Sequence, residues 1–404
     1  MPLSSEDLLR LNVLLAHDLQ AVRIDEQTLT VHGLTKDNEA HIPLNPNCRP
    51  AQYLKRVRET LSNHALGSPG GYPVFLQRWT RMGQAKDAQL EKLLLLGESE
   101  AVVAVAGAPG LTDDIARRAW WAMPTADIAR RMLERETVAQ GQMGKVLAAF
   151  LVEHLPFETD PLTTITTVRL VLQPGLIDDD LRRRIWTRGT QRNAYHLGFL
   201  EAVPDDLPAP VSARADYEAV RTALAPFADN PVATLLAKLL NSPGQTFLAV
   251  SEMQLHHPLD KYTTARLFDT IGNYFAPARR GAIREDIAAA LTHAESLVAK
   301  TEKAVGALLT AAPALRQEIV AMLALAHCGE AWVTPVISKT SASGTLLKRK
   351  LEPVVEPLLA QFAALQGKQR NGQDFKQENQ SALSRFYVLI LSIYLCLSSA
   401  GRYP

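Results

Sequence analysis

The chain has 404 residues, of which 47% are hydrophobic and 21% charged, and its formal net charge is +1. This composition excludes a generally disordered chain and leaves room for two or three domains. The balance of 43 basic against 42 acidic residues argues against a dedicated nucleic-acid-binding protein, which carries a basic excess.

Residues 1–70 are predicted to form a small α/β cap. Ser4 precedes a leucine-rich segment and is a typical helix N-cap. Three short strand-like runs follow at 21–24, 28–32 and 40–44, and the polar turns between them are typical of an antiparallel meander.

A helix predicted over 50–66 covers one face of this meander. The Pro- and Gly-rich residues 68–73 are a candidate linker. Because the N-terminus lacks a basic segment followed by an apolar core, we expect a cytoplasmic protein.

One phrase occurs three times within residues 71–276. Its copies run from Asp114 to Trp120, from Asp127 to Leu133 and from Asp180 to Trp186. The first and third copies follow a Pro-Gly-Leu turn, and no strand-rich interval interrupts the region. Repetition of this kind predicts an irregular, HEAT-like helical-repeat solenoid over 71–276.

Every copy of the phrase places an Asp four residues before an Arg, on one helix face. This spacing predicts the ion pairs Asp114–Arg118, Asp127–Arg131 and Asp180–Arg184. The apolar residues between the charges recur at i and i+4 and predict a buried stripe.

The Asp that opens each copy leaves four arginines of the phrase unpaired by this rule: Arg117, Arg130, Arg182 and Arg183. With Trp121 and Trp186 they form the predicted partner-binding face, suited to an acidic protein surface or a phosphate. The alternative interpretation is structural, with the arginines in salt bridges and the tryptophans in packing between helices.

Residues 277–404 are predicted to form a C-terminal helical bundle. Its expected helices cover 284–309, 314–327, 346–366 and 381–399, with a loop at 338–344. The most apolar run, Phe386–Leu397, is shorter than the roughly 20 residues that a membrane span needs. We therefore predict a buried helix there and no membrane span.

Two clusters are candidates for chemistry. Glu252 and His256 lie one helical turn apart with His257 beside them, but Pro258 breaks the helix, which favours helix-end histidines over a metal site. Cys328 is a candidate nucleophile that lacks an identified base. Phosphate-binding, dinucleotide, nucleophile-elbow and zinc-helix motifs are absent from the sequence. We predict no catalytic residue, metal or cofactor.

Residues 109–121 and 186–200 resemble DsrS-type sulfur reduction proteins of sulfur-oxidising bacteria. The resemblance implies a cytoplasmic accessory factor linked to dissimilatory sulfite reductase and the oxidation of stored sulfur. It carries no functional residues to this chain. Cys48, Cys328 and Cys396 are too widely spaced for a disulfide framework, and none lies in a polar tail suited to carrying sulfur.

The sequence thus predicts a mainly α protein with three domains, at 1–70, 71–276 and 277–404. Its predicted function is that of a non-enzymatic accessory or scaffold protein that binds a protein partner, with the sulfur-oxidation machinery as the implied partner. One alternative is an enzyme with a site near His256, His257 or Cys328, between the solenoid and the bundle. The other is nucleic-acid binding through the arginine-rich helical face.

Overall fold

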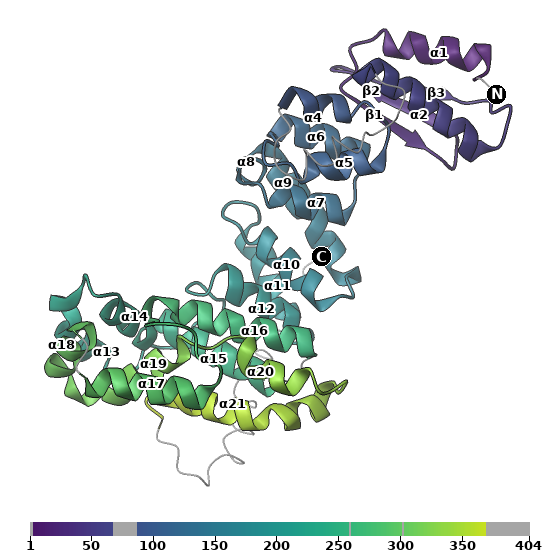
Figure 1. The fold of residues 1–404 in the computed structure, drawn as a ribbon. Helices are drawn as coiled ribbons and strands as arrows, with labels where there is room; N and C mark the ends of the chain where they lie inside the picture. The colour runs from purple at the N-terminus through teal and green to yellow at the C-terminus, as the bar shows by residue number, and fades with distance from the viewer. Residues whose placement is uncertain (1–2, 68–86, 258–259, 301–302, 369–404) are drawn as a thin grey trace, which may run out of the picture. The chain divides into compact units, whose positions relative to one another are not determined.

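The structure is a computed structural model that describes residues 3–67, 87–257, 260–300 and 303–368. It is helical except for one three-stranded sheet near the N-terminus (Figure 1). The predicted mainly helical fold with a small N-terminal sheet is therefore confirmed, while the solenoid stays a prediction. The chain divides into two compact units, unit 1 over 1–203 and unit 2 over 204–404.

This division differs from the three predicted domains. The cap and the helices up to α12 share unit 1. Residues on both sides of the predicted boundary at 276 share unit 2, because α14 (Pro231–Leu240) and α16 (Lys261–Phe275) pack against α19 (Arg316–Leu325).

The cap has the predicted order of elements. They are α1 (Ser5–Leu15), β1 (Ala21–Asp25), β2 (Thr30–Leu34), β3 (Glu39–Pro43) and α2 (Pro50–Leu66). The sheet is antiparallel in the order β1-β2-β3, with Ala21 opposite Leu34 and Thr30 opposite Pro43. The middle strand begins two residues later than predicted.

Local signals set the ends of the two cap helices. The Ser4 side chain accepts a hydrogen bond from the backbone N–H of Asp7, as predicted for an N-cap. Helix α2 begins with Pro50 and ends at Gly67, whose φ of 67° is the left-handed cap conformation that glycine adopts without strain. Both helices bury leucines against the sheet in one hydrophobic cluster.

The rest of unit 1 is a series of short helices. They are α4 (Asp87–Leu93), α5 (Ser99–Ala106), α6 (Asp113–Ala122), α7 (Ala126–Leu133), α8 (Glu136–Ala139), α9 (Gln142–His154), η1 (Leu155–Phe157), α10 (Pro161–Val171), α11 (Asp179–Arg188) and α12 (Asn193–Ala202). Helices α7 and α9 pack together, as do α10 and α12.

The repeated phrase forms helices α6, α7 and α11. Each begins after a polar N-cap whose side chain accepts from the backbone N–H three residues on; these caps are Thr112, Thr125 and Asp178. The Asp of the phrase therefore lies inside the first turn, where it complements the helix dipole. The predicted apolar stripe is buried, except that Leu181 is only half-buried.

Unit 2 is helical throughout its described residues. Its elements are α13 (Tyr217–Leu224), η2 (Ala225–Phe227), α14, α15 (Ser242–His256), α16, η3 (Ala276–Ala278), α17 (Ile287–Ala299), α18 (Lys303–Ala311), η4 (Pro313–Leu315), α19, α20 (Glu330–Ile337) and α21 (Gly344–Gln366). Helix α19 packs against both α17 and α21.

The helices of the structure match some of the predicted helices and differ from others. The single helix predicted over 284–309 is two helices, α17 and α18, and helix α20 was not predicted. The helix predicted over 346–366 is confirmed as α21. The linker at 68–73, the helix at 381–399 with its apolar run, and Cys396 lie outside the described residues.

Candidate functional site

The predicted partner-binding arginines have partners within the chain. In α6, Arg118 pairs with Asp114 as predicted. Arg117 also reaches Asp114, at 3.1 Å, and donates to the Gln20 side chain at 2.7 Å.

In α7 and α11 the acid pairs with the arginine three residues on instead of four. These pairs are Asp127–Arg130, at 2.5 Å, and Asp180–Arg183. Arg182 is half-buried and also makes a polar interaction. Arg117, Arg130 and Arg183, which the four-residue rule left unpaired, therefore each have an acidic partner, because positions i+3 and i+4 are both neighbours of position i on a helix surface.

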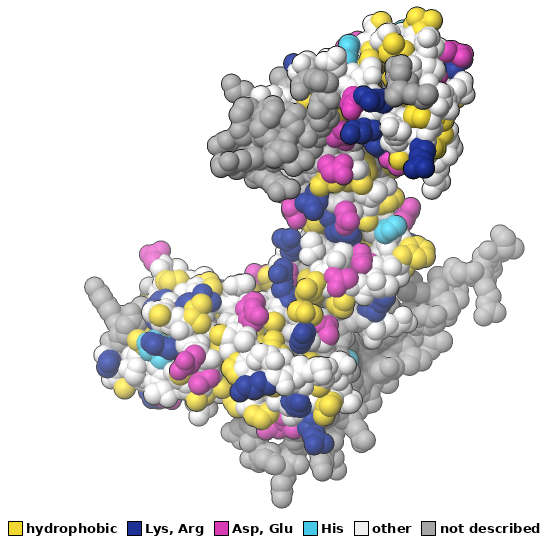
Figure 2. All heavy atoms as spheres, turned by 45° about the vertical axis from the view of Figure 1, so that its right-hand side comes forward, with side chains coloured by type: hydrophobic (Ala, Val, Ile, Leu, Met, Phe, Trp, Pro, Cys, Tyr) yellow, Lys and Arg dark blue, Asp and Glu magenta, His cyan; other side chains and the backbone are white. Residues whose placement is uncertain are grey.

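The surface charges are mixed. Figure 2 shows Lys and Arg side chains interspersed with Asp and Glu on the visible face. Arg117, Arg130 and Arg183 each pair with a carboxylate of the same helix, which reduces the uncompensated positive charge that the nucleic-acid alternative needs on this face.

Trp121 joins the cap to the helices of unit 1. Its indole N–H donates to the Glu39 carboxylate of β3 at 3.2 Å. The Arg23 guanidinium of β1 lies 4.9 Å from the centre of the Trp121 ring and 3.1 Å from the same carboxylate. Trp121 is thus engaged inside the unit and is only half-exposed to any partner.

The tryptophans that end the first and third phrases pack alike. Trp120 meets Phe150 of α9 edge to face at 4.9 Å between ring centres. Trp186 meets Phe199 of α12 edge to face at 5.0 Å and lies 4.3 Å from the ring of His196. Trp186 therefore packs between helices, the alternative that the sequence left open.

A row of partly exposed side chains continues from Trp120 along α9 into η1. It contains Val146, Phe150, His154 and Phe157, and with Trp120 we call it the aromatic stripe. Phe150 stacks on His154 at 5.4 Å, and His154 meets Phe157 at 6.1 Å between ring centres. Val146 is 49% exposed and Phe157 76% exposed.

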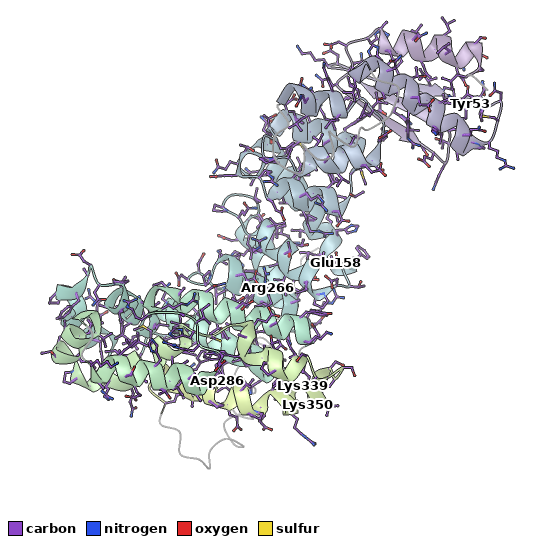
Figure 3. All side chains as sticks on the ribbon, in the orientation of Figure 1. Tyr53, Glu158, Arg266, Asp286, Lys339 and Lys350 are labelled. Atoms are coloured by element: carbon purple, nitrogen blue, oxygen red, sulfur yellow. The ribbon has the colours of Figure 1, made fainter. Side chains whose placement is uncertain are left out.

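Glu158, labelled in Figure 3, directly follows η1, the short helix that ends at Phe157. Its carboxylate lies 3.4 Å from the Arg130 guanidinium of α7, which also holds Asp127. Its backbone carbonyl accepts from Arg192, the residue that precedes α12, at 2.8 Å. Arg130, predicted to contact a partner, therefore holds Glu158, the neighbour of the exposed Phe157.

Of the residues of the enzyme alternative, His256 and His257 lie at an open pocket of about 310 Å³ in unit 2, whereas Cys328 is not part of its lining. Its lining comes from the end of α15, from α16 and from α21. Leu255, Phe268 and Leu351 contribute apolar surface, while His256 and His257 belong to the same lining. A pocket of this size can hold a small molecule.

His257 has a defined tautomer. Its Nδ1 lies 2.6 Å from the Met253 carbonyl, which can only accept, so Nδ1 carries a proton, and in the neutral ring Nε2 then has the lone pair. Glu252 does not join it, because its carboxylate accepts from Gln366 at 3.2 Å and pairs with Lys368 at 3.4 Å. The pocket therefore contains an imidazole acceptor without an assembled acid–base pair.

Cys328 is a buried thiol, 3% exposed. Burial, followed by the charge of Asp269, raises its pKa well above the usual value. The thiolate is the nucleophilic form, so this environment opposes the catalytic role offered in the alternative. Within the described residues, no group of three or more His, Cys, Asp or Glu side chains could hold a metal ion.

Comparisons with known proteins give no family for the chain: no family model, curated protein or solved structure matches it. Among the described helices, none is by itself long and apolar enough to cross a membrane, although the bent pair Pro313–Leu325 and Glu330–Ile337 passes by joint length and composition.

The aromatic stripe was missed in the sequence, although a signal for it exists there. Val146, Phe150, His154 and Phe157 recur at helical spacings of four, four and three residues. That spacing resembles a buried face, and α9 has a second apolar face that includes Leu147 and Leu151, both 0% exposed. Sequence alone does not say which of two apolar faces is buried.

Proposed function

We propose that this chain is a non-enzymatic accessory protein that binds a protein partner through the aromatic stripe. The observation that carries the proposal is the 76% exposure of Phe157 at the end of η1, next to Glu158, which Arg130 and Arg192 hold. A large apolar side chain held rigidly in water contributes little to folding, whereas aromatic side chains are enriched in the energetic centres of protein interfaces.

The proposed partner presents an apolar surface about three helical turns long. From Val146 to Phe157 the stripe advances by 11 residue steps, or about 16 Å of helix at 1.5 Å per residue. Such a ridge fits the groove between two helices of a partner. The exposed, ion-paired Arg117 and Arg183 contribute to steering and orientation and do not anchor the complex.

The resemblance to DsrS-type proteins supplies the partner class to test. We propose that the partner belongs to the cytoplasmic sulfur-oxidation machinery, with dissimilatory sulfite reductase as the first candidate. This step rests on the resemblance alone, and the stripe proposal does not depend on it.

Site-specific photo-crosslinking tests the stripe. A photoreactive amino acid at position 157 should crosslink to one partner in cells, and the same group at the exposed position 52 of α2 should not. The substitution Phe157→Ser should weaken binding of that partner at least tenfold, because truncation of an interface anchor costs about 2 kcal/mol or more.

The matched control is Leu9→Ser, which removes an apolar side chain that is 65% exposed elsewhere in unit 1. Binding should survive this change. Equal loss of binding in both variants, or no loss with Phe157→Ser, would contradict the proposal. Reconstitution with purified sulfite reductase tests the partner class separately.

A second candidate function, small-molecule binding, is favoured by the pocket at His257. The apolar lining and the Nε2 acceptor suit a mainly apolar ligand with one hydrogen-bond donor. Native mass spectrometry of the purified protein should detect a bound small molecule. The substitution Leu351→Trp fills the pocket, so this variant should lack the bound molecule. Absence of any adduct that depends on Leu351 would remove this candidate.

A further inference from the structure

Unit 2 contains a cluster of cationic groups apart from the pocket and from the phrase arginines. The loop between η3 and α17 carries Arg279, Arg280 and Arg284. His293 of α17 and His327, just after α19, lie beside it with their rings 5.4 Å apart. In the described part of the chain, none of the three arginines pairs with a carboxylate.

The partners of Arg279 and Arg280 are neutral carbonyls. Arg279 donates through Nε to Ala326 at 2.6 Å and through Nη2 to Gly272 at 3.2 Å. Arg280 donates through Nη1 to the carbonyls of Pro277 and Arg279. These bonds fix the guanidinium groups in place and leave their positive charges uncompensated.

His293 is held as a neutral imidazole. Arg284 can only donate, so its Nη2, 3.0 Å from Nδ1 of His293, requires a lone pair on that nitrogen. Nε2 of His293 then carries the proton and donates to the Arg280 carbonyl at 3.0 Å. The indole N–H of Trp332 donates to the Arg284 carbonyl at 3.0 Å and fixes the loop from the other side.

Two buried donors of the cluster have no partner. His327 is 1% exposed, and neither of its ring nitrogens makes a hydrogen bond. The buried Nε of Arg284 is also without one. Since buried polar groups are normally satisfied, each such atom calls for an explanation. Burial, followed by His293 and by the charges of Arg284 and Arg279, lowers the pKa of His327 to about 4.

We propose that Arg279, Arg284 and His327 form a binding site for a small oxyanion, a phosphate or sulfate group. Guanidinium forks bind such groups in two-pronged fashion, and a dianion would compensate the arginine charges and accept from both unpartnered donors. Neutral water satisfies the donors without compensating any charge, which is why the cluster favours an anion.

The loop leaves an approach to this site. Gly281, with φ of +74°, carries no side chain, and a Cβ placed there would have only Arg284 Nη2 and His293 Nε2 within 4 Å, each at 3.9 Å. Residues 281–283 are exposed. Asp286, labelled in Figure 3, caps α17 by accepting from Ala289 at 2.7 Å, so its carboxylate is engaged on the helix.

Thermal unfolding of the full chain in inorganic phosphate, compared with chloride at equal ionic strength, tests the site. An excess of about tenfold over the dissociation constant should raise the midpoint by about 4 °C. Sulfate should act likewise. A parallel measurement with glycerol phosphate distinguishes a free ion from the phosphate group of a larger molecule. If glycerol phosphate stabilises the protein as much as inorganic phosphate does, the site accepts the phosphate group of a larger molecule.

Arg284→Gln should abolish this stabilisation, and Arg221→Gln, which removes an exposed ion-paired arginine of the same unit, should retain it. If Arg284→Gln does not fold, calorimetry still measures phosphate binding to the unmodified protein. Because an anion favours the imidazolium form of His327, phosphate binding near pH 5.5 should take up about one proton, measured in two buffers of different ionisation enthalpy.

The proposal is overturned if phosphate and sulfate stabilise no more than chloride does. It is equally overturned if His327→Phe retains the full effect together with the proton uptake, since the buried imidazole then has no part in binding.

Discussion

Asp7 is an acidic residue with no exposed surface. Its Oδ2 accepts from the Tyr53 hydroxyl and from the backbone N–H of Asn45 at 2.8 Å. Burial, together with the hydrogen bond to Asp7, raises the pKa of Tyr53, which Figure 3 labels in the cap. A buried carboxylate of this kind is tolerated only while its donors remain.

Tyr53→Phe should therefore destabilise unit 1 by about 1–3 kcal/mol, because the phenyl ring retains the packing but removes a donor from Asp7. Urea unfolding measures the loss. Tyr262→Phe is the control, since Tyr262 is 60% exposed and its change should be close to neutral. An unchanged midpoint in Tyr53→Phe would show that the hydroxyl contributes nothing to the fold.

His327 should make unit 2 less stable in acid when phosphate and sulfate are absent. Its pKa falls from 6.5 in the unfolded chain to about 4 in the folded one, so the unfolded state binds the proton first. Stability is unaffected above pH 6.5 and is lost as the pH falls from there to about 4, by up to about 3 kcal/mol. Unfolding at several pH values should show a steeper loss for the natural protein than for His327→Gln.

At the scale of helices and strands, local signals predicted the cap well. The N-cap at Ser4, the proline that opens α2 and the alternating runs of β1 and β3 each act over a few residues. The helical class of the remainder followed from turn residues and apolar periodicity. These features depend on residues that are close in sequence, so they can be predicted without knowing the fold.

The candidate sites depend on residues far apart in sequence, and there prediction failed. Arg130 pairs with Glu158, 28 positions away, and this contact reverses its predicted role. The cationic cluster joins Arg279 and Arg284, in the loop before α17, to His327, which follows α19. The break between α17 and α18 was also missed, because the apolar spacing continues through it.

The stabilisation of the cap by its contacts with Trp121 can be measured. Its contacts with Glu39 and Arg23 combine a hydrogen bond, an ion pair and a cation–π contact. Trp121→Ala should speed amide exchange in β1–β3 by about tenfold or more, the equivalent of roughly 1.4 kcal/mol. Exchange in α10 and α12 should not change. The exposed Arg131→Ala serves as control, and uniform acceleration across unit 1 would mean that the cap is not held separately by this contact.

At the scale of the whole chain, the sequence divides into two compact units between Val203 and Pro204, just after α12 ends. Each has its own buried residues: the cap cluster and the phrase helices in unit 1, and the faces of α14, α16 and α19 in unit 2. The proposed partner surface belongs to unit 1 and the proposed anion site to unit 2. The two proposals can therefore fail independently.

The fragment 1–203 should fold alone, because its helices find their packing partners within the unit and the cut falls after a completed helix. Circular dichroism should show a helical spectrum and one cooperative urea transition, as expected of a single folding unit. The fragment 1–150 is the control: it cuts α9 (Gln142–His154) and removes α10 and α12, which exposes the apolar faces of α7 and α9, so its transition should be broad or absent. If 1–203 behaves like 1–150, unit 1 needs the rest of the chain to fold, and the stripe would then have to be tested in the full chain only.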